Sequence, residues 1–162
     1  MKFLHLLMFS VLTLLAGLPA HAGVKNSDCL DCHGDNTLVK TNAAGKAVSL
    51  FVDAAKLKLS IHKTNDCISC HVDVTAKHPD DNKPLAAVDC SICHKRQARS
   101  FNLSVHGQAL LSGHDEAPTC RDCHDSHEII SDRSPTSPIY RTRQAETCGT
   151  CHDKEARDWL AS

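Results

Sequence analysis

One long apolar run dominates the hydropathy pattern of the chain, and it lies at the N-terminus. Phe3–Leu18 is mostly apolar, Lys2 precedes it, and Ala20–Ala22 (A-H-A) follows it as a small-residue site. This order predicts a secretory signal peptide over residues 1–22, cleaved before Gly23. An uncleaved membrane anchor is the alternative, but the run is short for the ~20 residues of a membrane span.

Beyond this run, apolar positions are scattered, and no later segment is apolar enough to cross a bilayer. The pattern predicts short helices over Asp53–Ser60 and Lys95–Val105, each delivering a histidine at its C-terminal end. Asp153–Leu160 is expected to continue as a helix from the cysteine-containing stretch before it, with little help from internal ion pairs. Polar connections are expected over Gly34–Gly45 and, as an extended surface loop, over Ser131–Pro138.

The composition excludes several classes of protein. A formal net charge of −1 over 162 residues excludes a strongly basic nucleic-acid binder and a polyacidic tail protein. Only 4% of the residues are aromatic, which is too few for an ordinary core of large side chains. The length allows one domain or two very small ones, and we expect one domain over residues 23–162. Ten cysteines in this length indicate disulfides, a metal or a covalent cofactor.

Every cysteine belongs to a C-x-x-C pair, and a histidine follows each pair directly. The cysteines are Cys29, Cys32, Cys67, Cys70, Cys90, Cys93, Cys120, Cys123, Cys148 and Cys151, and the histidines are His33, His71, His94, His124 and His152. Two thiols on one helical turn can form thioethers to the two vinyl groups of a porphyrin, and the adjacent imidazole then reaches the iron. This attachment sequence of c-type haem predicts five covalently bound haems, with the five histidines as proximal ligands.

Two other roles of paired cysteines leave these histidines unexplained. Disulfides are common in exported proteins, and the spacing from Cys67 to Cys93 falls within the range of a zinc ribbon. Histidine occupies 12 of 162 positions, so five chance placements after five pairs have odds on the order of one in a million. The motifs therefore favour haem over both alternatives.

The number of motifs also predicts the fold class. Five haems leave roughly 28 residues of mature chain for each, which cannot bury a porphyrin alone. Neighbouring haems are therefore expected to pack against each other and replace the missing apolar core. The predicted fold is mostly irregular with short α-helices, organised around a close-packed chain of haems.

Five further histidines remain once the leader and the motifs are set aside, and they are His62, His78, His106, His114 and His127. Both methionines leave with the leader, so the count predicts bis-histidine ligation at all five haems. His62 and His106 share a local Ser-hydrophobic-His pattern ahead of a motif. His127 follows the fourth motif by three residues and is expected to reach a neighbouring haem. His78 precedes a proline and His114 follows a glycine. For these two histidines the alternative of a solvated side chain is stronger than for the other three.

The motifs, the S-x-H segments and the stretch Cys120–His127 resemble class III-type multihaem cytochromes c and the small pentahaem electron carriers of anaerobic respiration. The resemblance implies low-potential bis-histidine haems that shuttle electrons in the periplasm or outside the cell. Redox proteins are the expected partners: a membrane quinol dehydrogenase or other cytochromes, and a terminal reductase. No nucleic acid and no membrane insertion after leader removal are expected. The long interval between His33 and Cys67 departs from the family pattern.

Electron transfer is the expected function, and not catalysis, because six-coordinate iron leaves no position for a substrate. A small reductase with one open haem and a subunit of an extracellular haem filament are the alternatives. Five haems, with two propionates each, add a net charge of about −5 to the oxidised and −10 to the reduced protein. Basic residues such as Lys95, Arg96 and Arg99 are therefore expected to pair with propionates or to be solvated. Trp159 is expected to pack on a haem edge or in the core.

Overall fold

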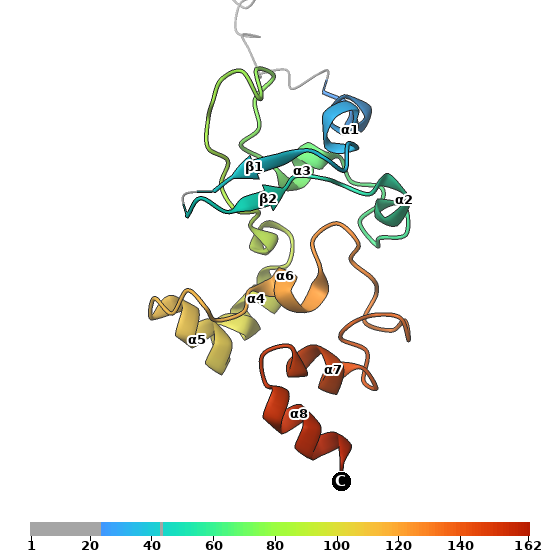
Figure 1. Ribbon diagram of the computed structural model, residues 1–162, viewed down its shortest axis with the longest axis vertical. Helices are drawn as coiled ribbons and strands as arrows, with labels where there is room; N and C mark the ends of the chain where they lie inside the picture. Colours follow the sequence, from blue (N-terminus) through green and yellow to red (C-terminus); the bar gives the residue numbers. More distant parts are fainter. Residues whose placement is uncertain (1–23, 43) are drawn as a thin grey trace, which may run out of the picture.

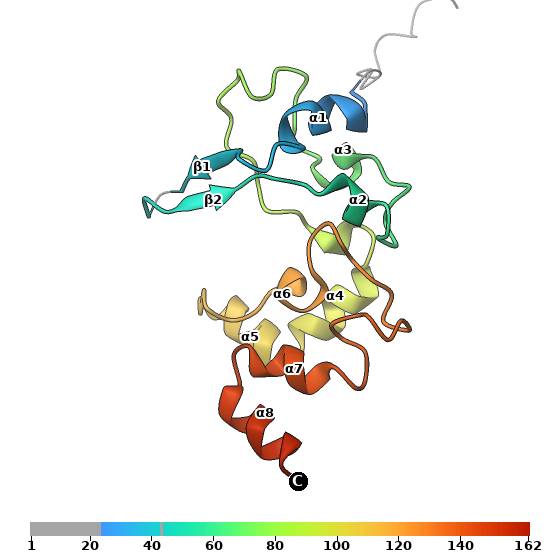
Figure 2. The ribbon, with the colours of Figure 1, turned by 45° about the vertical axis from the view of Figure 1, so that its right-hand side comes forward.

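The computed structural model describes residues 24–42 and 44–162, and the signal peptide predicted over residues 1–22 lies outside this range. The described chain is elongated and mostly irregular, with short helices and one small sheet, as the sequence predicts (Figures 1 and 2). Its helices are α1 (Asn26–His33), α2 (Ala54–Leu57), α3 (Cys67–Cys70), the 3-10 helix η1 (Cys90–Ile92), α4 (Lys95–Asn102), α5 (Val105–Leu111), α6 (Cys120–His124), α7 (Gln144–Gly149) and α8 (Asp153–Leu160).

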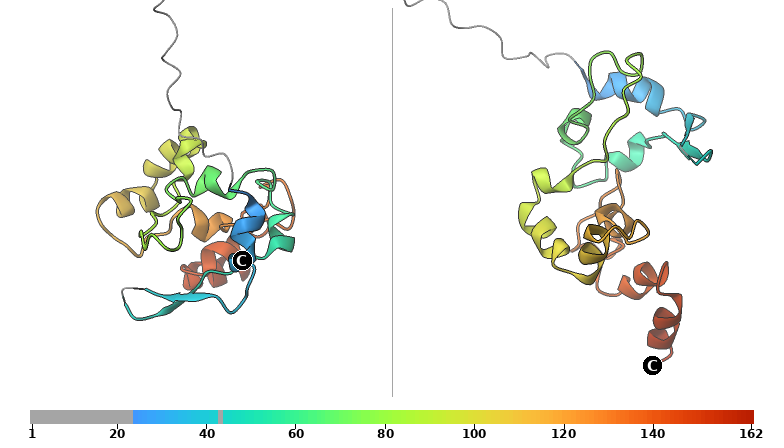
Figure 3. Two further views of the ribbon diagram at one scale, coloured as in Figure 1. Left: turned by 90° about the horizontal axis from the view of Figure 1, so that it is seen from above. Right: turned by 90° about the vertical axis from the view of Figure 1, so that its left-hand side faces the viewer.

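The elements follow the long axis roughly in the order of the sequence. The segment from α1 to α3 forms one end, α4, α5 and α6 lie in the middle, and α7 and α8 lead to the C-terminus at the other end (Figure 1). Figure 3 shows the same progression from the side, with the hairpin projecting from the body in the view from above. This arrangement spreads the five cysteine motifs along the length of the protein.

A hairpin occupies much of the long first interval, where the sequence predicts only a polar connection. Its strands β1 (Val39–Thr41) and β2 (Ala47–Ser49) pair antiparallel, with Lys40 opposite Val48. Gly45 lies in the connecting turn at φ +74°, a conformation that glycine adopts without strain. The polar connection predicted over Gly34–Gly45 therefore contains strand β1, which cross-strand hydrogen bonds stabilise despite a weak strand pattern.

The predicted helix over Asp53–Ser60 is shorter in the structure. The Asp53 carboxylate caps α2 by accepting hydrogen bonds from the backbone N–H groups of Ala55 (2.8 Å) and Lys56 (3.2 Å). The helix ends at Leu57, so His62 lies in the turns beyond it and is not the end of the helix.

The single helix predicted over Lys95–Val105 is two helices. α4 ends at Asn102, and Ser104 caps α5 because its side chain accepts a hydrogen bond from the backbone N–H of Gly107 (3.2 Å). A serine competes with the backbone in a helix interior and is favoured at an N-cap, which explains the break. His106 consequently lies in the first turn of α5.

Gly107 is buried where α5 folds back on the end of α4. A Cβ at this position would collide with the backbone of Phe101 and lie 2.7 Å from the Cα of Asn102. We therefore expect Gly107→Ala to lower the free energy of unfolding of the haem-loaded protein by about 1–3 kcal/mol. Asn102→Ala, at an exposed neighbouring position, is the control and should change it by about 0.5 kcal/mol or less. Equal urea midpoints for the two variants would contradict this account of the helix junction.

The C-terminal helices also differ from the prediction. α7 ends at Gly149 and α8 begins at Asp153, so the last motif does not run into one continuous helix. α8 carries two internal ion pairs, Asp153 with Arg157 and Lys154 with Asp158 (2.7 Å), and the expectation of little ion-pair support was wrong. In each pair the acidic and the basic residue are four positions apart, so they face each other across one helical turn. Such pairs stabilise an exposed helix modestly.

The Ser131–Pro138 segment folds into turns against α7 and is not a simple extended surface loop. Ser137 has no exposed side-chain surface, and the Pro138 carbonyl accepts a hydrogen bond of 2.6 Å from Thr147. The Arg143 guanidinium donates to the carbonyl of Thr136 at 3.0 Å. These contacts fix the segment to the helix that carries the fifth motif.

The described part of the chain buries no hydrophobic side chain, and its least exposed side chains are those of Ser60 and Ser137. Trp159 is 72% exposed, so it is not part of a protein core, while its expected packing on a haem edge stays a prediction. Residues 24–42 and 44–162 therefore form no apolar core of their own, as the low aromatic content predicts.

Candidate functional site

The five cysteine motifs adopt nearly the same local structure. α1, α3 and α6 each carry both cysteines of a motif, α7 carries the first cysteine of the fifth, and the third motif begins with η1. Acidic side chains cap several of these turns: the carboxylate of Asp122 accepts from the backbone N–H of Thr119 (2.7 Å), and Asp89 accepts from Ser91 (2.8 Å). The turn brings both thiols of a motif to one face, as a double thioether attachment requires.

All ten cysteines lie in the described part of the chain, and none of them forms a disulfide. Over the same residues, no three side chains of the ligand types His, Cys, Asp or Glu are grouped as a metal-ion site. The spacing from Cys67 to Cys93 is therefore not folded into a zinc-type cluster.

Successive motifs lie next to each other in the order of the sequence. Burial, together with the neighbouring Cys29 thiol, raises the pKa of Cys67 to about 11. Burial and the thiols of Cys120 and Cys70 raise the pKa of Cys90. Each of these neighbours belongs to the motif before or after, so the contacts define a row that runs from the first to the fourth motif.

The fifth motif lies at the end of this row, next to the fourth. Burial and the neighbouring thiols of Cys148 and Cys151 raise the pKa of Cys123, which links the fourth motif to the fifth. The five attachment points therefore form one linear series along the long axis of the protein.

Four histidine pairs combine a motif histidine with a histidine from outside the motifs. The distances between ring centroids are 6.4 Å for His33 and His78, 6.2 Å for His71 and His127, 5.7 Å for His94 and His62, and 6.0 Å for His152 and His106. Two imidazoles on opposite sides of one metal, with bonds of about 2.0–2.1 Å to each nitrogen, place their ring centroids about 6.3 Å apart. The four pairs thus fit the axial ligands of four haem irons.

The remaining two candidates, His114 and His124, form no such ring pair within the described residues. His124 ends α6 and is exposed. His114 is also exposed and follows Gly113, whose φ of +85° turns the chain after α5. The backbone N–H of His114 donates to the carbonyl of Ala109 at 3.1 Å, which holds this turn against the end of α5.

The first-motif histidine is oriented by the hairpin in the long first interval. The Nδ1 atom of His33 lies 2.8 Å from the carbonyl oxygen of Leu50, just after β2, and the backbone N–H of Val52 donates to the carbonyl of His33 at 2.7 Å. Because the carbonyl can only accept, Nδ1 carries the proton and Nε2 is the free nitrogen. Such a hydrogen bond fixes the tautomer and orientation of a metal-ligating histidine.

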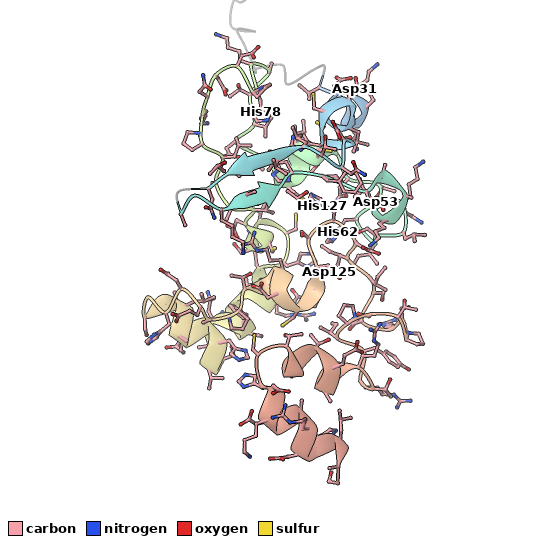
Figure 4. All side chains as sticks on the ribbon, viewed as in Figure 1. Asp31, Asp53, His62, His78, Asp125 and His127 are labelled. Atoms are coloured by element: carbon pink, nitrogen blue, oxygen red, sulfur yellow. The ribbon has the colours of Figure 1, made fainter. Side chains whose placement is uncertain are left out.

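Two segments far apart in sequence hold His62 and His127 near each other. The backbone N–H of Ile61 donates to the carbonyl of Ile129 at 2.9 Å, and Lys56 forms an ion pair of 3.0 Å with Glu128. Figure 4 shows both histidines in this junction between the N-terminal end and the α6 region, whereas His78 lies apart in the loop above. The Lys56–Glu128 ion pair and the hydrogen bond from His33 to the Leu50 carbonyl have no signature in the sequence, so the sequence did not predict them.

The surroundings of His127 suit a metal ligand. A cavity of about 250 Å³ opens beside it, lined by Phe51, Val52, Asp53, Lys56, Asp125, Ser126, His127 and Glu128. Desolvation lowers the pKa of His127 and also that of its ring partner His71. A lowered pKa favours the neutral imidazole, which is the form that binds iron.

Comparison with known proteins gives one match. Residues 113–157, which include the fourth and fifth motifs, match a family described as a doubled CXXCH motif. This match indicates a multihaem c-type cytochrome-like protein with covalently bound c-type haem and a role in electron transfer. Searches of curated proteins and of solved structures gave no match. Among the described residues, no helix has the length and apolar character needed to span a bilayer.

Proposed function

We propose that this chain is an exported pentahaem c-type cytochrome, similar to the small pentahaem carriers, that passes electrons between anaerobic respiratory proteins. The observation that carries the proposal is the set of four pairs of motif and non-motif histidines, with ring centroids 5.7–6.4 Å apart. The five CXXCH sequences supply the attachment residues for five haems. A bound haem supplies one-electron exchange between ferric and ferrous iron.

The structure supports a ligand assignment for four of the five haems, and that of the remaining haem follows from the one histidine that is left. The cysteines of each motif form the thioethers, and the ring pairs assign His78 to the first haem, His127 to the second, His62 to the third and His106 to the fifth. His114 remains for the fourth haem, opposite His124. With both axial positions held by imidazole, these residues leave no vacant axial position in the resting protein and favour low potentials.

The row of motifs supports a linear path for electrons. Thiols of adjacent motifs lie near enough to raise the pKa of a neighbouring thiol from the first motif to the fifth, which supports haems arranged in the order of the sequence. The first and fifth haems would then lie at opposite ends of the long axis (Figure 2). A redox partner at either end would reach one terminal haem, and the periplasmic partners expected from the sequence fit this use. The leader-like N-terminus supports a periplasmic location.

The haem content tests this proposal. Intact-mass spectrometry of the protein purified from a host with the cytochrome c maturation system should show five covalent haems for each chain. The pyridine haemochrome spectrum of the same sample should give the same number, with both vinyl groups saturated. Fewer than five haems on the full-length chain would contradict it.

Replacing His114 with alanine tests the ligand that the ring pairs do not assign. We expect His114→Ala to convert one haem in five from low-spin to high-spin, because His124 then remains as the single imidazole on the fourth iron. Electron paramagnetic resonance of the oxidised protein measures the change. Gln108→Ala, on the preceding helix, is the control and should keep all haems low-spin. An unchanged low-spin signal in His114→Ala would show that another residue ligates the fourth haem.

A further inference from the structure

The loop between α3 and η1, residues 72–88, carries His78 and is held together by its own polar groups. The Thr75 hydroxyl donates to the Asp81 carboxylate at 2.5 Å, and the other oxygen of Asp81 accepts from the backbone N–H of Lys83 at 3.1 Å. The Asp73 carboxylate accepts from the backbone N–H of Ala86 at 2.7 Å. These bonds close the loop on itself, and it projects from the N-terminal end of the molecule (Figure 1).

The same loop has little attachment to the rest of the protein. Within residues 24–42 and 44–162, every hydrogen bond of residues 72–88 has its partner inside residues 71–86, and none of these residues joins an ion pair. From Thr75 to Val88 the side chains are exposed apart from half-buried Asp81. The ring pair of His78 with His33, with centroids 6.4 Å apart, is the side-chain pairing that relates this loop to the first motif.

The other paired distal histidines lie on segments that the body of the protein holds. His62 follows the buried Ser60 and the Ile61–Ile129 backbone hydrogen bond, which also fixes the segment of His127. His106 precedes Gly107, which is buried against the end of α4. Local opening is easiest where few contacts are lost, so His78 is the one of these four paired distal histidines whose departure costs least.

His33, the motif histidine of the first haem site, is anchored much more firmly than His78. His33 lies in α1, and the hydrogen bond from Nδ1 to the Leu50 carbonyl, 2.8 Å, fixes its ring to the hairpin. A histidine oriented in this way is a firmly positioned ligand. Of the two imidazoles that would hold the first iron, His33 is therefore the more firmly positioned and His78 the less.

We propose, building on the pentahaem function above, that the His78 side of the first haem is an exchangeable position that takes small uncharged π-acceptor ligands. In the exchange, the bond between the ferrous iron and the His78 imidazole breaks, and a bond to the carbon of the incoming carbon monoxide forms. The imidazole leaves neutral with its electron pair, and no electron or proton is transferred. His62, His106 and His127 stay on the segments that the body holds, and the hydrogen bond of 3.1 Å from the His114 backbone N–H to the Ala109 carbonyl keeps His114 against the end of α5. The protein therefore takes one such ligand per chain.

Carbon monoxide titration of the dithionite-reduced, haem-loaded full chain tests the stoichiometry. Difference spectra should show one carbon monoxide bound for every five haems. His78→Ala should also bind one, and faster, because the competing imidazole is gone. His127→Ala is the matched control and should bind two, because it opens a second haem. No binding to the wild-type chain, or two ligands on His78→Ala, would overturn the proposal.

The rate of exchange tests the role of the loop without removing a ligand. Thr75→Val removes the hydrogen bond to Asp81 and should speed carbon monoxide binding about fivefold, with the stoichiometry still one. Thr37→Val, which removes a comparable exposed bond to Asp35 outside the loop, should leave the rate unchanged. Equal rates in wild type and Thr75→Val would overturn the proposal. A sample with five low-spin haems that fails these tests overturns this inference alone, whereas a sample with fewer haems overturns the pentahaem function itself.

Discussion

Replacing all ten cysteines with alanine is expected to leave a chain with no cooperative unfolding transition. The described residues bury no hydrophobic side chain, so the polypeptide has little apolar burial to set against the loss of backbone entropy. That loss is about 1–2 kcal/mol for each ordered residue, which a few turns and hydrogen bonds do not offset. Thermal unfolding followed by circular dichroism is the measurement, and the haem-loaded wild type should show a clear transition.

A single-motif variant provides the control for this experiment. Replacing only Cys148 and Cys151 removes the attachment of the haem at one end of the row, and the remaining four should keep a cooperative transition at a lower midpoint. A sharp transition in the chain without any cysteine would show that the protein folds on its own. The idea of the haems as the core would then be wrong.

Replacing His127 with methionine should raise the reduction potential of one haem by on the order of 0.1 V, a fraction of the ≈ 0.8 V range that axial ligands span. His127 pairs with His71, and a thioether in place of an imidazole stabilises ferrous iron. Potentiometric titration followed at the haem absorption bands measures the shift.

Ser126→Met is the matched control for this ligand exchange. Ser126 precedes His127 and lines the same cavity, so a methionine there tests whether the thioether shifts a potential without replacing a ligand. We expect its five potentials to match those of the wild type. Unchanged potentials in His127→Met would show that His127 is not an axial ligand.

The sequence predicts what depends on local spacing. Two cysteines three apart need only one turn, so the motif turns and the mostly irregular fold with short helices follow from the motifs themselves. The break after Asn102 and the two ion pairs of α8 are also local, since Ser104 is a favoured N-cap and Arg157 stands four residues after Asp153. The sequence interpretation gave these signals too little weight.

The pairing of histidines depends on tertiary structure, so spacing could not predict it. His127 stands three residues after His124, yet its ring lies beside His71, more than fifty residues earlier in the chain. The contacts that place it, Lys56 with Glu128 and Ile61 with Ile129, join segments with no sequence signal in common. The hairpin beside His33 was missed because each of its strands has only three residues, too few for an alternating apolar pattern to be recognised.

The central claim is that five haems are each held between two histidines of this chain. Electron paramagnetic resonance of the oxidised full-length protein, with the spins integrated against its haem content, tests it most directly. The account predicts five low-spin ferric haems for each chain and no high-spin signal. A high-spin signal amounting to one haem or more in the wild-type protein would contradict it.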